Sequence, residues 1–379
     1  MTDYRRRQRT AQAELAEAGL DLAVFGAGPN LQYLTGASVD WRRFADLGAR
    51  TTSLFLPVDG RPILLTGPYA GEETDLPCTV RQMGLFDDTR SAVEAAVDEL
   101  PDRPERVAVD GYAEASVAVA VEDHVPGSDI DSHEGLLAST RAIKSPEEVE
   151  ALRDAAELTD RIMADVVDDL EPGDTMREVE LSIEHRARAA GASDVSFPPT
   201  AGFCRSGSEP SDEVFNYDPE EPLDPGSSVA FDVGLVHDGY CSDWGRSVYV
   251  GEPPAHIADA YAALMTAVTE TIDAIGDDVR TVDDLFPHVE RVCDREGYGE
   301  YLRNRHTNGV VGHQIGVEVH EDPWLRPDGD AELREGMVFC LEPKLWNDGE
   351  YYLRVEDMVH VTADGAESLT RFDRDRFVV

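Results

Sequence analysis

Three acidic residues interrupt apolar segments in the C-terminal half of the chain, and this feature limits how those segments can fold. They are Asp232 in SSVAFDVGLV, Glu342 in GMVFCLEPKLW and Glu356 in YYLRVEDMVHV. An ionised carboxylate that is buried without a partner costs several kcal/mol. An exposed strand face would explain any one of these acids, but three acids in successive apolar segments predict a shared compensating charge. A pair of metal ions is the simplest such charge.

A fourth carboxylate, Asp243, is predicted to lie beside Asp232. The segment between them contains Asp238-Gly239, a dipeptide that favours a tight hairpin turn. Such a hairpin would place the Asp232 and Asp243 carboxylates opposite each other on neighbouring strands. Asp238 itself is interpreted as a turn residue and not as a ligand.

A histidine completes the predicted metal site. His313 lies in GVVGHQIGVEVHEDP, with Gly312 and Gly316 beside it. A lone histidine is a weak candidate for a ligand, but a glycine-flanked histidine beside inward-facing carboxylates is a better one. Four carboxylates and one imidazole form a hard, oxygen-rich ligand set, which suits manganese, iron, cobalt or zinc. Two such ions about 3.5–4 Å apart would activate a bridging water and polarise a carbonyl.

The hydrophobic periodicity divides the chain into two regions, with a boundary near residues 137–145. Residues 1–140 alternate helices and strands, beginning with a helix over 4–18, and predict an α/β domain. Residues 141–379 contain two helix pairs, each followed by strands, which predicts an α+β arrangement with helices on one face of an antiparallel sheet. The helices are predicted over 145–170, 171–191, 253–277 and 281–296, the first with a Ser145 cap. The strands are predicted over 227–236, 240–250, 336–346 and 351–361.

The charge balance excludes nucleic acid as a partner. The chain has 77 acidic and 33 basic residues, a formal net charge of −44, and only two lysines, Lys144 and Lys344. A chain this acidic would repel DNA and RNA, while its 41% hydrophobic content argues against disorder. The composition is typical of proteins from organisms that accumulate molar salt, because dissolved ions screen the repulsion. A specific cationic partner is the alternative interpretation.

The sequence also predicts a cytoplasmic protein without a membrane span. No segment approaches the roughly 18 consecutive apolar residues that a membrane helix needs, and the N-terminus lacks the apolar core of a signal peptide. The five cysteines are widely spaced and form no CxxC pair. They are therefore interpreted as small buried hydrophobic residues and not as disulfides or zinc ligands.

Several motifs together resemble one known family. The segments DVGLVHDGYCSDWGRS, GHQIGVEVHEDP, GMVFCLEP and LRVEDMVHVTADGAESLT are similar to motifs of the creatinase, aminopeptidase P and prolidase family, the M24 metallopeptidases. NLQYLTG (30–36) and RAIKSPEEVEALRDA (141–155) resemble the N-terminal domain and the interdomain linker of that family. The resemblance implies a C-terminal "pita-bread" catalytic domain over 141–379, a smaller creatinase-like α/β domain over 1–140, and a homodimer.

The resemblance also implies a role for each metal ligand. Asp232 would chelate one metal ion through both carboxylate oxygens. Asp243 and Glu356 would bridge the two ions, and His313 and Glu342 would hold the other ion. Manganese is the first choice, with cobalt, zinc or iron as alternatives.

Catalytic and substrate-binding roles follow from the same resemblance. Glu342 would act as general base and acid toward the bridging water. His320 would contact the substrate and help to stabilise the tetrahedral intermediate. Arg354, two residues before Glu356, would support the carboxylate network.

Two departures from the family pattern affect the predicted substrate. Asn216 stands where peptidases of this family usually carry a substrate-facing histidine, and Asp-Trp-Gly-Arg-Ser (243–247) replaces the usual Asp-x-Thr-Arg-Thr. An amide can donate a hydrogen bond but cannot shuttle a proton at neutral pH. The first hypothesis is an Xaa-Pro peptidase, either an aminopeptidase P or a prolidase. The alternatives are an M24 hydrolase of a small non-peptide amide or amidine, as ectoine hydrolase and creatinase are, and a non-catalytic binding protein with the same fold.

Overall fold

A computed structural model describes most of the chain, and its contacts divide the chain into two compact units. The described residues are 2–37, 52–67, 76–84, 87–133, 135–210 and 218–379. The units are Met1–Thr140 and Arg141–Val379. Among the described residues, no helix combines the length and the apolar character that crossing a bilayer requires.

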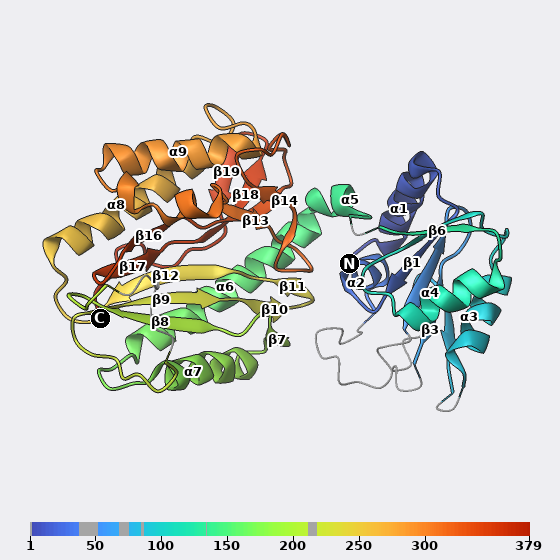
Figure 1. The fold of residues 1–379 in the computed structure, drawn as a ribbon, viewed down its shortest axis with the longest axis horizontal. Helices are drawn as coiled ribbons and strands as arrows, with labels where there is room; N and C mark the ends of the chain where they lie inside the picture. Colours follow the sequence, from blue (N-terminus) through green and yellow to red (C-terminus); the bar gives the residue numbers. More distant parts are fainter. Residues whose placement is uncertain (1, 38–51, 68–75, 85–86, 134, 211–217) are drawn as a thin grey trace. The chain divides into compact units, whose positions relative to one another are not determined.

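The first unit is built on a six-stranded mixed sheet in the order β4-β3-β2-β1-β5-β6 (Figure 1). Its strands are β1 (Leu22–Gly26), β2 (Ser53–Pro57), β3 (Ile63–Thr66), β4 (Thr79–Gln82), β5 (Arg106–Val109) and β6 (Asp129–Ser132). Its helices are α1 (Tyr4–Ala18), α2 (Pro29–Thr35), α3 (Thr89–Asp98) and α4 (Ala115–His124), and α5 (Ala138–Ala142) follows them. Every residue of β1, β2 and β3 is buried, so both faces of these central strands are covered.

The second unit consists of antiparallel sheets and two helix pairs, which confirms the predicted α+β arrangement. Its helices are α6 (Pro146–Asp168), α7 (Met176–Ala189), α8 (Ala255–Asp273) and α9 (Val282–Arg295), with short 3-10 helices at Gly299–Tyr301 and Arg303–Thr307. Its strands are β7 (Asp194–Val195), β8 (Thr200–Arg205), β9 (Ser227–Val233), β10 (Leu235–His237), β11 (Tyr240–Cys241), β12 (Trp244–Tyr249), β13 (Gly312–Gln314), β14 (Glu321–Leu325), β15 (Val338–Leu341), β16 (Lys344–Asn347), β17 (Tyr351–Arg354), β18 (Asp357–Thr362) and β19 (Gly365–Ser368). Figure 1 shows α8 and α9 on one side of these strands and α7 on the opposite side, so the prediction that the helices cover one face is wrong.

Each helix pair has its own hydrophobic core against a different group of strands. Ile162 of α6 and Ile183 of α7 share a core with Phe231 of β9. Leu264 of α8 and Val289 of α9 belong to a second core, which includes residues of β15 and β18. The strands between these cores are therefore shielded from water on both sides, which is the setting in which a buried charge needs a partner.

Sequence-local signals determine where the helices begin. Ser145 caps α6 and forms a capping box with Glu148, as the sequence predicts. Thr175 and Glu178 form the same box at the start of α7.

The four strands predicted around the acidic residues are each divided in two, so the prediction of continuous strands is wrong. The segment 227–236 divides at Gly234, and 240–250 divides at Ser242 and Asp243. The segment 336–346 divides at Glu342 and Pro343, and 351–361 divides at Val355 and Glu356. At each break the chain leaves one sheet and joins another, as from the five-stranded sheet β14-β13-β15-β18-β19 to the ribbon β16-β17. Three of the four predicted ligand carboxylates lie at these breaks.

Candidate metal centre

Asp232 and Glu356 face each other across a glycine. Asp232 of β9 pairs in register with Gly245 of β12, and Gly245 forms an isolated antiparallel bridge with Glu356. The Glu356 backbone N–H donates to the Gly245 carbonyl over 2.8 Å. A Cβ atom on Gly245 would lie 2.7 Å from Arg354 Nε and 2.9 Å from Glu356 Cβ. The glycine therefore leaves the space in which side chains from two different sheets meet.

Asp243 reaches the same place from the link between β11 and β12. The hairpin prediction had placed Asp243 directly opposite Asp232. In the structure Asp243 lies two residues before Gly245, the register partner of Asp232, so it is diagonal to Asp232. The offset follows from the register of β9 and β12, in which Asp232 pairs with Gly245. The predicted turn is present: His237 pairs with Tyr240 around Asp238-Gly239, and both turn residues have positive φ.

His313 lies against Asp243 in the interior. Its Nε2 is 3.5 Å from Asp243 Oδ2, and both residues are buried. Its Nδ1 lies 3.1 Å from the Gln314 carbonyl, an arrangement that leaves Nε2 directed at the carboxylate. Candidate ligand atoms of Asp243, His313, Glu356 and Cys340 all lie within 4.8 Å of one another.

Two cations contact carboxylates of this cluster. Arg354 contacts Asp232, and its Nη2 donates to Glu356 Oε2 over 2.7 Å and to Glu342 Oε2 over 2.8 Å. Lys344 contacts the same Glu342 oxygen. The four carboxylates Asp232, Asp243, Glu342 and Glu356 thus outnumber the two basic side chains that contact the cluster, Arg354 and Lys344.

Burial and these neighbours shift the pKa values of the cluster in different directions. Burial, followed by repulsion from Asp243, raises the pKa of Glu356 well above its usual range. Burial likewise raises the pKa of Asp243, although a hydrogen bond with His313 opposes the shift. Burial opposes ionisation of Glu342, but Lys344 and Arg354 lower its pKa to about 2. Burial also opposes protonation of His313, but Asp243 raises its pKa to about 9.

The residues fit a divalent cation. Asp243 Oδ1 and Glu356 Oε1 are buried and accept no hydrogen bond from any described residue. A buried acceptor without a partner is costly, and a cation between these two oxygens would satisfy both. Carboxylate oxygens with one imidazole are a donor set for such ions.

The neighbouring acid, Asp357, is balanced by protein groups alone. It is fully buried, contacts Arg246, and accepts from Arg374 Nη2 over 2.9 Å. Successive residues of a strand point to opposite faces, so Asp357 turns away from the side to which Glu356 points. Asp357 therefore has protein counter-ions of its own, whereas the adjacent Glu356 belongs to the cluster.

His320 forms the outer part of the site. It is exposed, its ring centroid lies 4.3 Å from that of His313, and it stacks on Trp324 at 5.2 Å. Partial burial of its ring, followed by the His313 charge, lowers the pKa of His320, which favours a neutral imidazole at neutral pH. Asn216 lies outside the described residues.

Two residues near the cluster were not singled out as site residues by the sequence. Cys340 pairs in register with His313, but burial raises the pKa of its thiol well above the usual range, which favours the protonated form. Lys344 lies two residues after Glu342. Because this chain has only two lysines, a lysine beside a predicted metal ligand could have been singled out from the sequence.

Comparisons with known proteins agree with this geometry. The model of "Metallopeptidase family M24" matches residues 150–363, and that of "Creatinase/Prolidase N-terminal domain" matches residues 7–143. The chain is similar to the probable dipeptidase PepE of Mycobacterium tuberculosis, with 31% identity over 394 aligned residues that cover 99% of this chain and 96% of the relative.

Solved structures show the same fold over the whole chain. A recombinant prolidase from Thermococcus sibiricus matches with a TM-score of 0.84 and 26% identity, covering 100% of both chains. The dipeptidase PepE of Mycobacterium ulcerans matches with a TM-score of 0.78 and 28% identity, covering 99% of this chain and 98% of the other. The predicted pita-bread fold with a creatinase-like N-terminal domain is thereby confirmed.

Proposed function

The chain belongs to metallopeptidase family M24, and we propose that it is an Xaa-Pro peptidase, specifically a dipeptidase. The observation that carries the proposal is the pair of buried carboxylate oxygens without partners, Asp243 Oδ1 and Glu356 Oε1, in a cluster with His313. Relatives named dipeptidase and prolidase that align over almost the whole chain support the substrate class.

In this proposal the cluster binds two divalent ions, with manganese as the first choice for an oxygen-rich site. The ligands would be Asp232, Asp243, His313, Glu342 and Glu356. When bound, the ions supply an activated water and polarise the scissile carbonyl. Four carboxylates and one imidazole offer more donor atoms than a single ion takes, which supports two ions and not one.

The protein groups would then move protons and orient the substrate. Lys344 and Arg354 would hold Glu342 in the ionised form, and Glu342 would accept a proton from the water and return it to the leaving amine. His320, exposed beside His313, would donate a hydrogen bond to the substrate. Arg354 would keep Asp232, Glu342 and Glu356 in place through its three contacts.

Hydrolysis assays test the proposal directly. An Xaa-Pro dipeptide and an Xaa-Pro tripeptide would each be incubated with the protein in molar KCl with added manganese. Cleavage of the dipeptide alone is the expected result, and cleavage of the longer peptide would instead mean an aminopeptidase P. If protein with measured bound metal cleaves neither, the Xaa-Pro assignment is wrong and a small non-peptide amide or amidine becomes the candidate substrate.

We also propose that the protein works in molar salt, as a homodimer in the cytoplasm. The net charge of −44 supports the salt requirement, because repulsion among exposed carboxylates weakens when ions shorten the screening length. The melting temperature is expected to rise steadily between about 0.1 M and 3 M KCl, where the screening length falls from about 10 Å to below 3 Å. A melting temperature that does not change with salt would contradict this, and light scattering in the same buffers would give the oligomeric state.

A further inference from the structure

Lys344 places a positive charge beside the metal ligands. Its side chain is 15% exposed and contacts Glu342 Oε2. The register of the β16–β17 ribbon pairs Lys344 directly with Arg354, whose Nη2 donates to the same Glu342 oxygen. Like charges directly opposite on paired strands are unfavourable, so their joint placement indicates a role in the charge balance of the site.

The backbone of Lys344 is held in place by a buried amide. Its N–H donates to Asn304 Oδ1 over 2.9 Å, and Asn304 Nδ2 donates to the Val310 carbonyl over 2.7 Å. Asn304 is itself buried. The start of β16 is therefore a fixed point from which the flexible lysine side chain can reach into the site.

Metal binding would change the charge balance around Lys344. With both ions bound, the carboxylates of Asp232, Asp243, Glu342 and Glu356 would carry four negative charges, and the two divalent ions would neutralise them. Arg354 then still has three carboxylate contacts, whereas Lys344 has one ion-pair partner among the described residues, Glu342. A surplus positive charge at Lys344 would favour an anionic group on the substrate.

A dipeptide presents such a group at the required place. Its C-terminal carboxylate carbon is two bonds, roughly 2.5 Å, from the scissile nitrogen, so only a cation next to the metal ligands can reach it. In a longer peptide the same position is a neutral amide. We propose that Lys344 binds the C-terminal carboxylate of the substrate and thereby selects dipeptides. The inference rests on the proposed function and attributes the selection of dipeptides to one residue.

Three proteins test the inference: wild type, Lys344→Met, which removes the charge, and Lys344→Arg, which keeps it. For each, kcat/KM would be measured with an Xaa-Pro dipeptide and with the same dipeptide as its C-terminal amide. In Lys344→Met the ratio of the two values is expected to fall about 10- to 100-fold, mainly through KM of the dipeptide, because a charge-assisted hydrogen bond is lost. Lys344→Arg should recover most of the ratio. Circular dichroism and metal content would establish that each variant is folded and loaded.

An equal loss with both substrates would overturn the inference, since it would mean that Lys344 acts only by positioning Glu342. An unchanged ratio would overturn it as well.

Calorimetric titration with proline and prolinamide separates the inference from the proposed function. If wild type cleaves neither substrate, the peptidase proposal falls, and weaker binding of proline but not of prolinamide by Lys344→Met would still support the carboxylate site. Equal proline affinities in wild type and Lys344→Met would overturn it.

Discussion

The two units bury charge in different ways. In the first unit Arg7 donates to the Tyr33 carbonyl, and Asp110 Oδ1 accepts from three backbone N–H groups, while Asp110 Oδ2 has no hydrogen-bond partner among the described residues. In the second unit four carboxylates, two of them buried, gather around His313 and share Arg354 and Lys344. Backbone groups can partly balance a single buried charge, but a cluster of like charges needs a counter-ion from outside.

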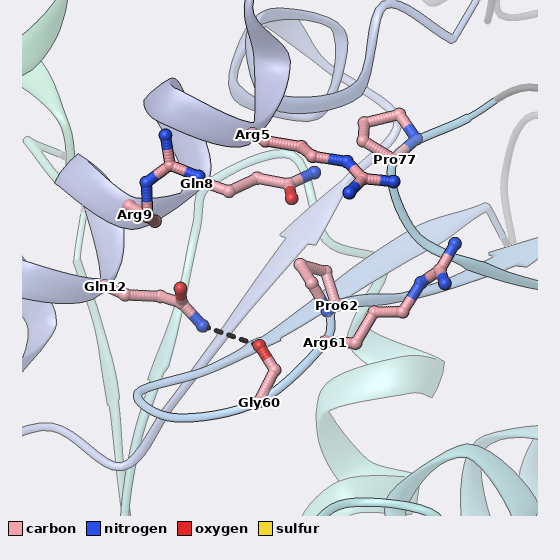
Figure 2. Close-up of a pocket in the computed structure, with 8 residues that line it drawn as sticks. All are labelled: Arg5, Gln8, Arg9, Gln12, Gly60, Arg61, Pro62 and Pro77. Atoms are coloured by element: carbon pink, nitrogen blue, oxygen red, sulfur yellow. Dashed lines mark hydrogen bonds between the residues drawn. The ribbon is translucent and has the colours of Figure 1, made fainter.

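The arginines of the two units differ in their exposure to water. Figure 2 shows Arg5, Arg9 and Arg61 around an open pocket of about 260 Å³ in the first unit, with Gln12 bonded to the Gly60 carbonyl. These three arginines are exposed, so water can solvate them. Arg354, by contrast, is buried among acids. The position of a charge relative to water therefore separates a structural or surface role from a role in the site.

The largest expected effect comes from removing a carboxylate of the cluster. Glu356→Gln is expected to weaken metal binding by more than about 100-fold, because even outer-shell changes cost 10- to 100-fold. The rise in melting temperature on adding metal should shrink accordingly, since stabilisation follows the ratio of free metal to Kd. Elemental analysis would measure the metal content, and thermal melts with and without manganese would measure the rise in melting temperature. Unchanged metal content would mean that Glu356 is not a ligand.

The adjacent acid supplies the matched control. Asp357→Asn leaves Arg246 buried beside a neutral amide, and breaking a buried pair in this way costs about 3–5 kcal/mol. The number of metal ions bound per chain should stay that of wild type, because Asp357 points away from the cluster. Denaturant unfolding gives the free energy, and a loss of metal with little loss of stability would reverse the assigned roles of the two residues.

A smaller effect is expected for the isolated acid of the first unit. Burial raises the pKa of Asp110 to about 6, although hydrogen bonds from Gly26, Tyr112 and Ala113 oppose the shift. Because the folded-state pKa lies above the unfolded value, the contribution of Asp110 to stability is full below about pH 4. It is lost as pH rises through about 6, in total on the order of 3 kcal/mol.

Asp110→Asn should remove this pH dependence. The difference in unfolding free energy between variant and wild type should therefore change between pH 4 and pH 7 and then level off, with metal content unchanged. Denaturant titrations at constant molar KCl across this range would measure it. A difference that is independent of pH would show that Asp110 does not titrate in this window.

Much of the local structure could be predicted from the sequence. The helix predicted over 4–18 matches α1, and Ser145 caps α6, because apolar spacing and capping act over a few neighbouring residues. The Asp238-Gly239 turn followed from backbone preferences at positive φ. The candidate ligands were identifiable for a related reason: an acid inside an apolar segment already signals that something must balance its charge.

Other features depended on contacts between distant segments. The strands around the acids break where the chain changes sheets, and Asp232, Gly245 and Glu356 align only because strands more than 100 residues apart pair there. Alternation along a strand could not tell which of Glu356 and Asp357 faces the cluster, since both lie in one apolar segment. The sequence by itself determined the helix caps, the tight turn and the types of residue available as ligands. The tertiary structure decided which acids share a counter-ion and that Lys344 joins them, because electrostatic energy depends on distances in space and not on positions along the chain.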